Sequence, residues 1–160
     1  MKKFLSCLVT AVAGVFLISA ASFAAEVKTD YFTITLADGW TQSEPVQNAN
    51  GTVVAIFQYP DGTGAVSIAV TSAPLSARDL ADQTLNNMKS GGFTVSAPEA
   101  SGDSYVGEFS RQQAKGICYF TSNGRKGSVI TIAGTDTAPG SAFLNRNFKP
   151  ADARLFPASF

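Results

Sequence analysis

The residues that could do chemistry in this 160-residue chain are mainly carboxylates, because the sequence contains no histidine. The lack of histidine excludes Ser-His-Asp and Cys-His nucleophile systems and histidine metal ligands. Glu99, Asp103 and Glu108 could form a calcium site or an acid/base group, but their spacing matches no EF-hand loop. A solvated polar loop over residues 99–103 explains them more simply. We therefore predict no catalytic residue, no metal ligand set and no cofactor, and we do not expect an enzyme.

Four basic residues are the best candidates for a partner-binding surface. They flank the apolar run 114–121 and the turn that follows it, and they are Arg111, Lys115, Arg125 and Lys126. Residues 111–160 contain 7 basic and 2 acidic residues, whereas residues 25–110 contain 3 basic and 10 acidic residues. This asymmetry favours either a basic patch for an anionic partner or complementary halves of one sheet. The ordinary alternative for the four residues is that they are solvated strand ends.

Residues 1–24 have the features of a secretory signal peptide. Lys2 and Lys3 precede the apolar run Leu5–Ala21, and small residues at 22 and 24 predict cleavage after Ala24. An uncleaved membrane anchor is the alternative, but the run is short for a bilayer span, which needs about 20 residues. We expect a periplasmic or secreted protein that does not span the membrane after cleavage.

Residues 25–160 fit a single domain with a short C-terminal tail. Cleavage would leave one cysteine, Cys118, so no intramolecular disulfide can form and the core alone must stabilise the fold. Cys118 lies in an apolar run, which favours a buried thiol over a reactive one. After cleavage, residues 25–160 would have a net charge of −2. This net charge and the expected export both argue against nucleic-acid binding.

Alternating apolar residues predict a mainly antiparallel sheet. In the first strand, over residues 31–36, Phe32, Ile34 and Leu36 share one face. Asn50-Gly51 predicts a type I′ hairpin. The following run, 52–59, is apolar on both faces, as in a central strand covered on both sides. Further strands are expected over residues 65–71, 93–97, 105–109, 114–121 and 128–133, with a second hairpin turn at 123–127.

Two helices are expected to cover this sheet. The longer one starts at an N-cap, Ser76, carries an apolar stripe over residues 77–88, and ends at Gly91-Gly92. The shorter helix spans residues 141–147, and the apolar tail after Pro150 is expected to pack. The predicted fold class is α+β, with a mainly antiparallel sheet of about six strands flanked by helices.

The segment 32–40, Phe-Thr-Ile-Thr-Leu-Ala-Asp-Gly-Trp, resembles the opening signature of the PsbP-like superfamily, which also includes Mog-type and DcrB-like proteins. The segment Asn147-Phe148-Lys149-Pro150 resembles the end of the closing helix in this superfamily, where an aromatic residue lies near a Lys-Pro pair. The resemblance covers about residues 30–150. Ala37 departs from the proline that is usual there. The resemblance implies an α-β-α sandwich without enzymatic activity, since members mostly act as binding or accessory subunits. Trp40 itself is expected to lie in the core.

Three functions follow from these observations. The first is an exported, non-enzymatic accessory or protein-interaction domain that acts on another protein of the cell envelope. The second is a periplasmic protein that binds a small ligand or an ion such as calcium. The third, and the least favoured, is a carboxylate-based hydrolase, which would need two carboxylates facing each other across a cleft.

Overall fold

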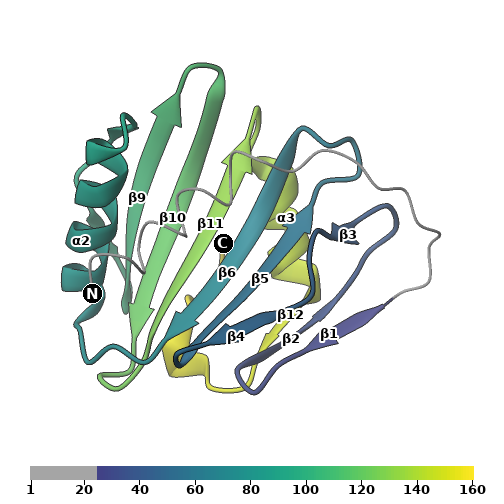
Figure 1. Ribbon diagram of the computed structural model, residues 1–160, viewed down its shortest axis with the longest axis horizontal. Helices are drawn as coiled ribbons and strands as arrows, with labels where there is room; N and C mark the ends of the chain where they lie inside the picture. The colour runs from purple at the N-terminus through teal and green to yellow at the C-terminus, as the bar shows by residue number, and fades with distance from the viewer. Residues whose placement is uncertain (1–24) are drawn as a thin grey trace.

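The computed structural model describes residues 25–160 (Figure 1), so the expected signal peptide and its cleavage site lie outside the described residues. Within the described part of the chain, no helix is long and apolar enough to cross a membrane. The described elements form two sheets, two α-helices and one short 3₁₀-helix.

The larger sheet contains nine strands, more than the six expected, and every pairing in it is antiparallel. Its main path runs β3-β5-β6-β11-β10-β9-β7, with β4 paired to β5 and β8 paired to β9. The additional strands are pieces of two or three residues at the edges, which are too short to produce an apolar alternation. The nine strands are β3 (Thr41–Gln42), β4 (Gln47–Ala49), β5 (Thr52–Gln58), β6 (Gly64–Thr71), β7 (Thr94–Val95), β8 (Glu99–Ser101), β9 (Ser104–Arg111), β10 (Ala114–Ser122) and β11 (Gly127–Gly134).

The first predicted strand belongs to a separate, smaller sheet. This sheet has the order β1-β2-β12, with β1 (Glu26–Lys28), β2 (Phe32–Thr35) and β12 (Phe148–Pro150). Ile34 pairs with Phe148, so the start of the domain is joined directly to its end. The expected apolar face is real, because Phe32 and Ile34 are fully buried, but it packs against the large sheet instead of extending it.

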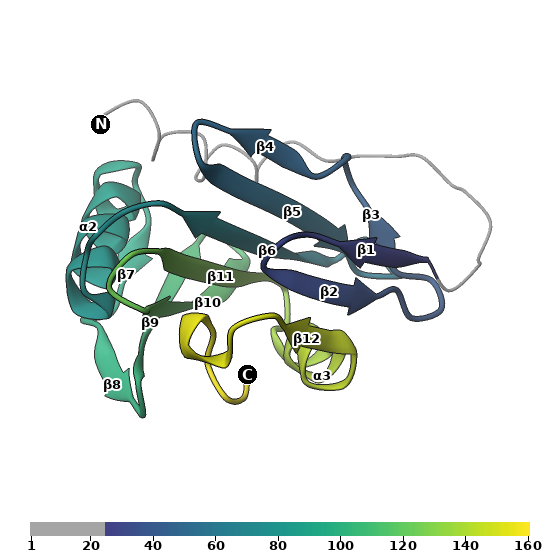
Figure 2. The ribbon, with the colours of Figure 1, turned by 90° about the horizontal axis from the view of Figure 1, so that it is seen from below.

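The helices lie on opposite faces of the large sheet (Figure 2). Helix α2 (Ala77–Ser90) packs on β9 and β10 with a core that includes Leu80, Leu85 and Phe120. Helix α3 (Ala138–Asn147), the small sheet and the C-terminal tail cover the other face. The tail packs as predicted, since Leu155 and Phe156 next to the 3₁₀-helix η1 (Ala153–Leu155) are buried. The α+β prediction is therefore confirmed at the level of layers.

The predicted ends of the long helix are observed. The backbone N–H of Asp79 donates to Ser76 Oγ at 3.1 Å, and the Ser76 hydroxyl donates to the Asp79 carboxylate at 2.6 Å. This is a capping arrangement that satisfies a free N–H of the first turn. Beyond the helix, Gly92 has φ +87°, a left-handed conformation that glycine adopts without strain.

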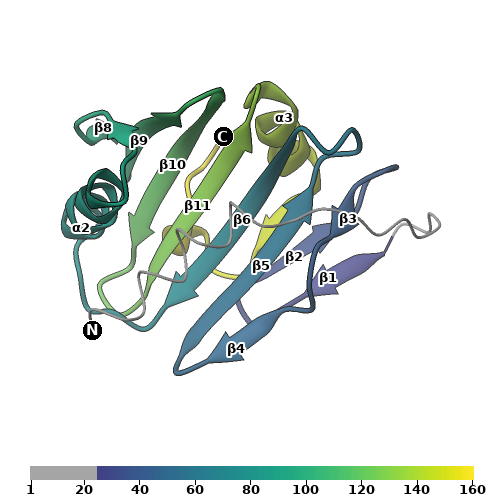
Figure 3. The ribbon, with the colours of Figure 1, turned by 45° about the horizontal axis from the view of Figure 1, so that its top comes forward.

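The turn predictions give mixed results. Asn50 and Gly51 both have positive φ, as a type I′ turn requires, and they connect β4 to β5. The expected polar loop at 99–103 is wrong, because residues 99–101 form β8 and pair with β9 through a tight turn at Gly102 (Figure 3).

Strand β5 was expected to be covered on both faces, and this prediction is wrong. Val53, Ala55 and Phe57 on one face are buried, while the residues between them, on the other face, are half-buried.

Candidate functional site

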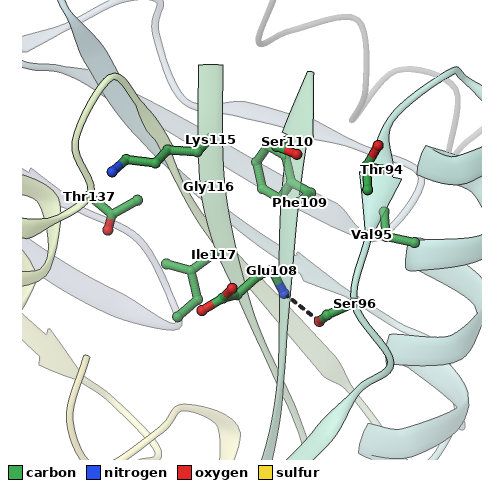
Figure 4. A pocket seen from close by; sticks show the side chains of 10 residues that line it. All are labelled: Thr94, Val95, Ser96, Glu108, Phe109, Ser110, Lys115, Gly116, Ile117 and Thr137. Carbon is green, nitrogen blue, oxygen red and sulfur yellow. Dashed lines mark hydrogen bonds between the residues drawn. The ribbon is translucent and has the colours of Figure 1, made fainter. Parts of the chain in front are cut away.

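An open groove of about 560 Å³ lies on the face of β9 and β10 that α2 does not cover (Figure 4). It reaches from the edge strand β7 to Thr137, at the start of α3. Both charged and apolar side chains line it. The lining residues are Thr94, Val95, Ser96, Glu108, Phe109, Ser110, Lys115, Gly116, Ile117 and Thr137.

The register of the β9–β10 hairpin places the functional side chains on this face. Lys115 pairs with Ser110, and Ile117 pairs with Glu108, so these four side chains share one face of the sheet. Phe109, which stands between Glu108 and Ser110 on β9, points to the other face of the sheet, into the core under α2. Gly116 is required beneath that ring, because a Cβ there would collide with Phe109 and would lie 2.6 Å from the carbonyl oxygen of Ile132.

Ser96, the residue directly after β7, holds the backbone of Glu108 in place. The backbone N–H of Ser96 donates to the Glu108 carbonyl at 2.9 Å. Ser96 Oγ accepts from the backbone N–H of Glu108 at 2.9 Å and donates to the carbonyl of Ala97 at 3.0 Å. Both the backbone N–H and the backbone C=O of Glu108 are thus bonded to Ser96, and its exposed carboxylate is directed into the groove (Figure 4).

The two charges in the groove are not paired with each other. In the part of the chain that the structure describes, ion pairs join Arg78 to Asp82 and Arg154 to Asp152, and neither Glu108 nor Lys115 takes part in one. Figure 4 shows the Lys115 side chain extended toward Thr137, whereas the Glu108 carboxylate lies beside Ile117. The groove therefore presents one anion and one cation to a ligand, over a half-buried apolar floor.

The four predicted basic residues do not form one patch. Arg111 and Lys115 flank the β9–β10 hairpin turn, and Arg125 and Lys126 lie in the β10–β11 turn at the opposite end of the sheet (Figure 1). The strand between them puts the two pairs about 23 Å apart, at about 3.3 Å per residue. Residues 111–115 are all exposed, so the hairpin tip is an accessible surface.

Three of these side chains differ in how they are held. Lys126 Nζ donates to Tyr31 Oη at 2.7 Å and to Ser72 Oγ at 3.3 Å, and it lies 4.7 Å from the centre of the Tyr31 ring. It thereby ties the β10–β11 turn to the loop before β2. The guanidinium of Arg111 lies over the Phe93 ring at 5.3 Å, while Arg125 is exposed. Lys126 thus has a structural role, and Arg111 and Lys115 keep their charge at the surface.

The three carboxylates that could have formed a calcium site are separated. Glu99 lies on β8, Asp103 lies in the turn, and Glu108 is two residues beyond the partner of Glu99 on β9. Among the described residues, no group of three or more aspartate, glutamate, cysteine or histidine side chains could hold a metal ion. Of the three, only Glu108 lines the groove, so a second carboxylate does not face it there.

The one described thiol is buried. Cys118 is buried under α2, and this burial raises its pKa to about 12, although a hydrogen bond with Thr131 opposes the shift. Burial likewise raises the pKa of Tyr59 to about 12. The burial of Cys118 agrees with the buried thiol that the sequence predicted, and the raised pKa values of both groups disfavour a reactive anion.

Trp40 connects the opening segment to α3. Its ring stacks on Phe143 with centroids 3.8 Å apart and planes 9° apart, and it also contacts Tyr59 at 5.0 Å. The indole is partly buried against the core, not enclosed in it. This differs from the core position expected, because the stack lies at the edge of the sheet where the chain enters β3.

Comparisons with known proteins identify the fold. No protein-family model matches the chain, and no curated protein matches it. The solution structure of cyanobacterial PsbP (CyanoP) from Synechocystis sp. PCC 6803 is similar, with a TM-score of 0.52 at 9% identity over 85% of this chain and 98% of that chain. The chain therefore has a PsbP-like fold. A structure from Bacteroides thetaiotaomicron has a TM-score of 0.39 at 11% identity, over 76% of this chain and 46% of that chain, which is too low to support an argument.

Proposed function

We propose that this chain is an exported, non-enzymatic accessory domain that binds another protein of the cell envelope. The observation that carries the proposal is the PsbP-like fold, which extends over 85% of the chain and 98% of CyanoP. The superfamily that the sequence resembles also includes the Mog-type and DcrB-like proteins. Its members mostly act as binding or accessory subunits. Export and periplasmic location rest on the sequence of residues 1–24.

The chemistry of the described residues supports binding better than catalysis. The groove contains a single carboxylate, and burial raises the pKa of the one described thiol. A retaining or inverting hydrolase needs two carboxylates across one cleft, about 5–10 Å apart. We therefore favour a binding function and place the hydrolase last.

The β9–β10 hairpin tip is the surface that we assign to the partner. It presents five consecutive exposed residues and carries two cations, Arg111 and Lys115. Neither side chain contributes to the buried core, so both charges are available to an acidic patch on another protein.

Cross-linking in intact cells followed by co-purification tests the proposal. We expect one envelope protein to co-purify in stoichiometric amount, and we expect Arg111→Glu to reduce its recovery severalfold. Lys28→Glu is the matched control, because Lys28 is an exposed cation on β1 and lies far from the tip. If no protein is recovered, or if both variants behave alike, the proposed surface is wrong. Export is checked separately by the mass of the mature protein, which should begin at Ala25.

A further inference from the structure

The geometry of the groove points to a second binding function: we infer that it binds a small zwitterion with a free amine and a free carboxylate, of amino-acid or dipeptide size. The Glu108 carboxylate would accept from the ammonium group, and the Lys115 ammonium would donate to the carboxylate. Ile117 would contact the apolar part of the ligand. This inference does not rest on the proposed protein partner, although both functions would use Lys115.

The arrangement of charges is the first argument. Glu108 and Lys115 are diagonal neighbours across the β9–β10 ladder, yet they form no ion pair. Their side chains diverge, with Lys115 directed to Thr137 and Glu108 beside Ile117 (Figure 4). A ligand that carries only one charge would be attracted by one of the two side chains and repelled by the other. A zwitterion can satisfy both groups at once.

The polar and apolar lining is the second argument. The Thr137 hydroxyl makes no capping hydrogen bond to α3, so it can bond to a ligand carboxylate held by Lys115. Ser96 binds the backbone N–H and C=O of Glu108, which holds the point on β9 from which the carboxylate extends into the groove. The volume of about 560 Å³ lies within the range of small-molecule sites, about 300–1,000 Å³. The open shape predicts weak binding, with a Kd of about 1 mM.

The experiment is an NMR titration of the ¹⁵N-labelled protein with three matched probes. The first is the dipeptide L-alanyl-L-leucine, the second is its N-acetyl derivative, and the third is its C-terminal amide. We expect saturable shifts of the backbone amides of Ser96, Glu108 and Ile117 with the free dipeptide. Each blocked probe should bind about tenfold more weakly, because each lacks one charge-assisted hydrogen bond.

Two variants assign the roles of the charges. Glu108→Gln should remove the preference for a free amine and retain the preference for a free carboxylate, while Lys115→Gln should do the reverse. Glu99→Gln and Lys149→Gln are exposed controls outside the groove and should leave all three affinities unchanged. Unperturbed amide shifts far from the groove will show that each variant is folded.

Three results would overturn the inference. The first is equal affinity for the three probes, which would mean that Glu108 and Lys115 neutralise each other in solution. The second is the absence of saturable shifts in the groove up to about 10 mM, tenfold above the expected Kd. The third is a loss of affinity for all probes alike in both variants, which would make the residues structural.

Discussion

The stack of Trp40 on Phe143 should be one of the most important contacts for stability. Phe143 is 3% exposed, and it joins α3 to β5 through Phe57 and to the opening segment through Trp40. Burying a phenylalanine removes about 170 Å² from water, which at about 25 cal/mol per Å² is about 4 kcal/mol. We therefore expect Phe143→Ala to lower the free energy of unfolding by about 4 kcal/mol.

A double-mutant cycle separates the stack from simple burial. Urea unfolding followed by circular dichroism is the assay, because it does not depend on Trp40 fluorescence. Trp40→Leu and Phe143→Leu should show a coupling energy of about 1 kcal/mol, as expected for an aromatic pair. The control pair is Trp40→Leu with Phe109→Leu, since Phe109 lies in the separate core under α2 and should not couple. A Trp40–Phe143 coupling no larger than the control would refute the stacked geometry.

Three further predictions concern single positions. Ser76→Ala should lower the free energy of unfolding by about 1 kcal/mol through loss of the N-cap, whereas Ser76→Thr, which keeps a hydroxyl for both bonds with Asp79, should retain most of it, as measured by urea unfolding. Gly92→Ala should cost about 1 kcal/mol in the same assay, because alanine is strained at φ +87°, and Gly91→Ala at φ −80° should cost less. Because burial raises the pKa of Cys118 from 9.0 to about 12, its stabilising contribution is complete below pH 9 and is lost as the pH rises toward 12. Unfolding at pH 10 should therefore be easier by about 1 kcal/mol than at pH 8, and Cys118→Ala should reduce this pH dependence; an unchanged slope in that variant would contradict the assignment.

The sequence predicted the long elements because their patterns are physical consequences of burial. The stripe of α2 and the apolar faces of β6 and β11 were visible as periodicity, and capping and turn residues set their limits. Short edge strands were missed because residues such as Glu99 and Ala100 on β8 are exposed and carry no alternation. Their strand conformation comes from backbone pairing with β9, which depends on tertiary structure.

The groove could be predicted only in part. Lys115 and Glu108 were each singled out, but for different roles, because their proximity depends on the hairpin register. That register is set by a turn in which Gln112 has φ +55°, and glutamine gives no warning of such a turn. Thr137 and Ser96 come from distant parts of the chain, and no local pattern marked them. The separation of Arg111 from Arg125 likewise depends on the length of β10.

Site-specific photo-cross-linking at the β9–β10 hairpin tip tests the central claim most directly. A photoreactive amino acid is placed at Gln113, which is exposed at the tip, and in a control at Asn48, which is exposed on β4. The proposal predicts that illumination of intact cells joins one envelope protein to the chain at position 113 and not at position 48. The same adducts at both positions, or no adduct at position 113, would contradict an accessory domain that binds its partner through this hairpin.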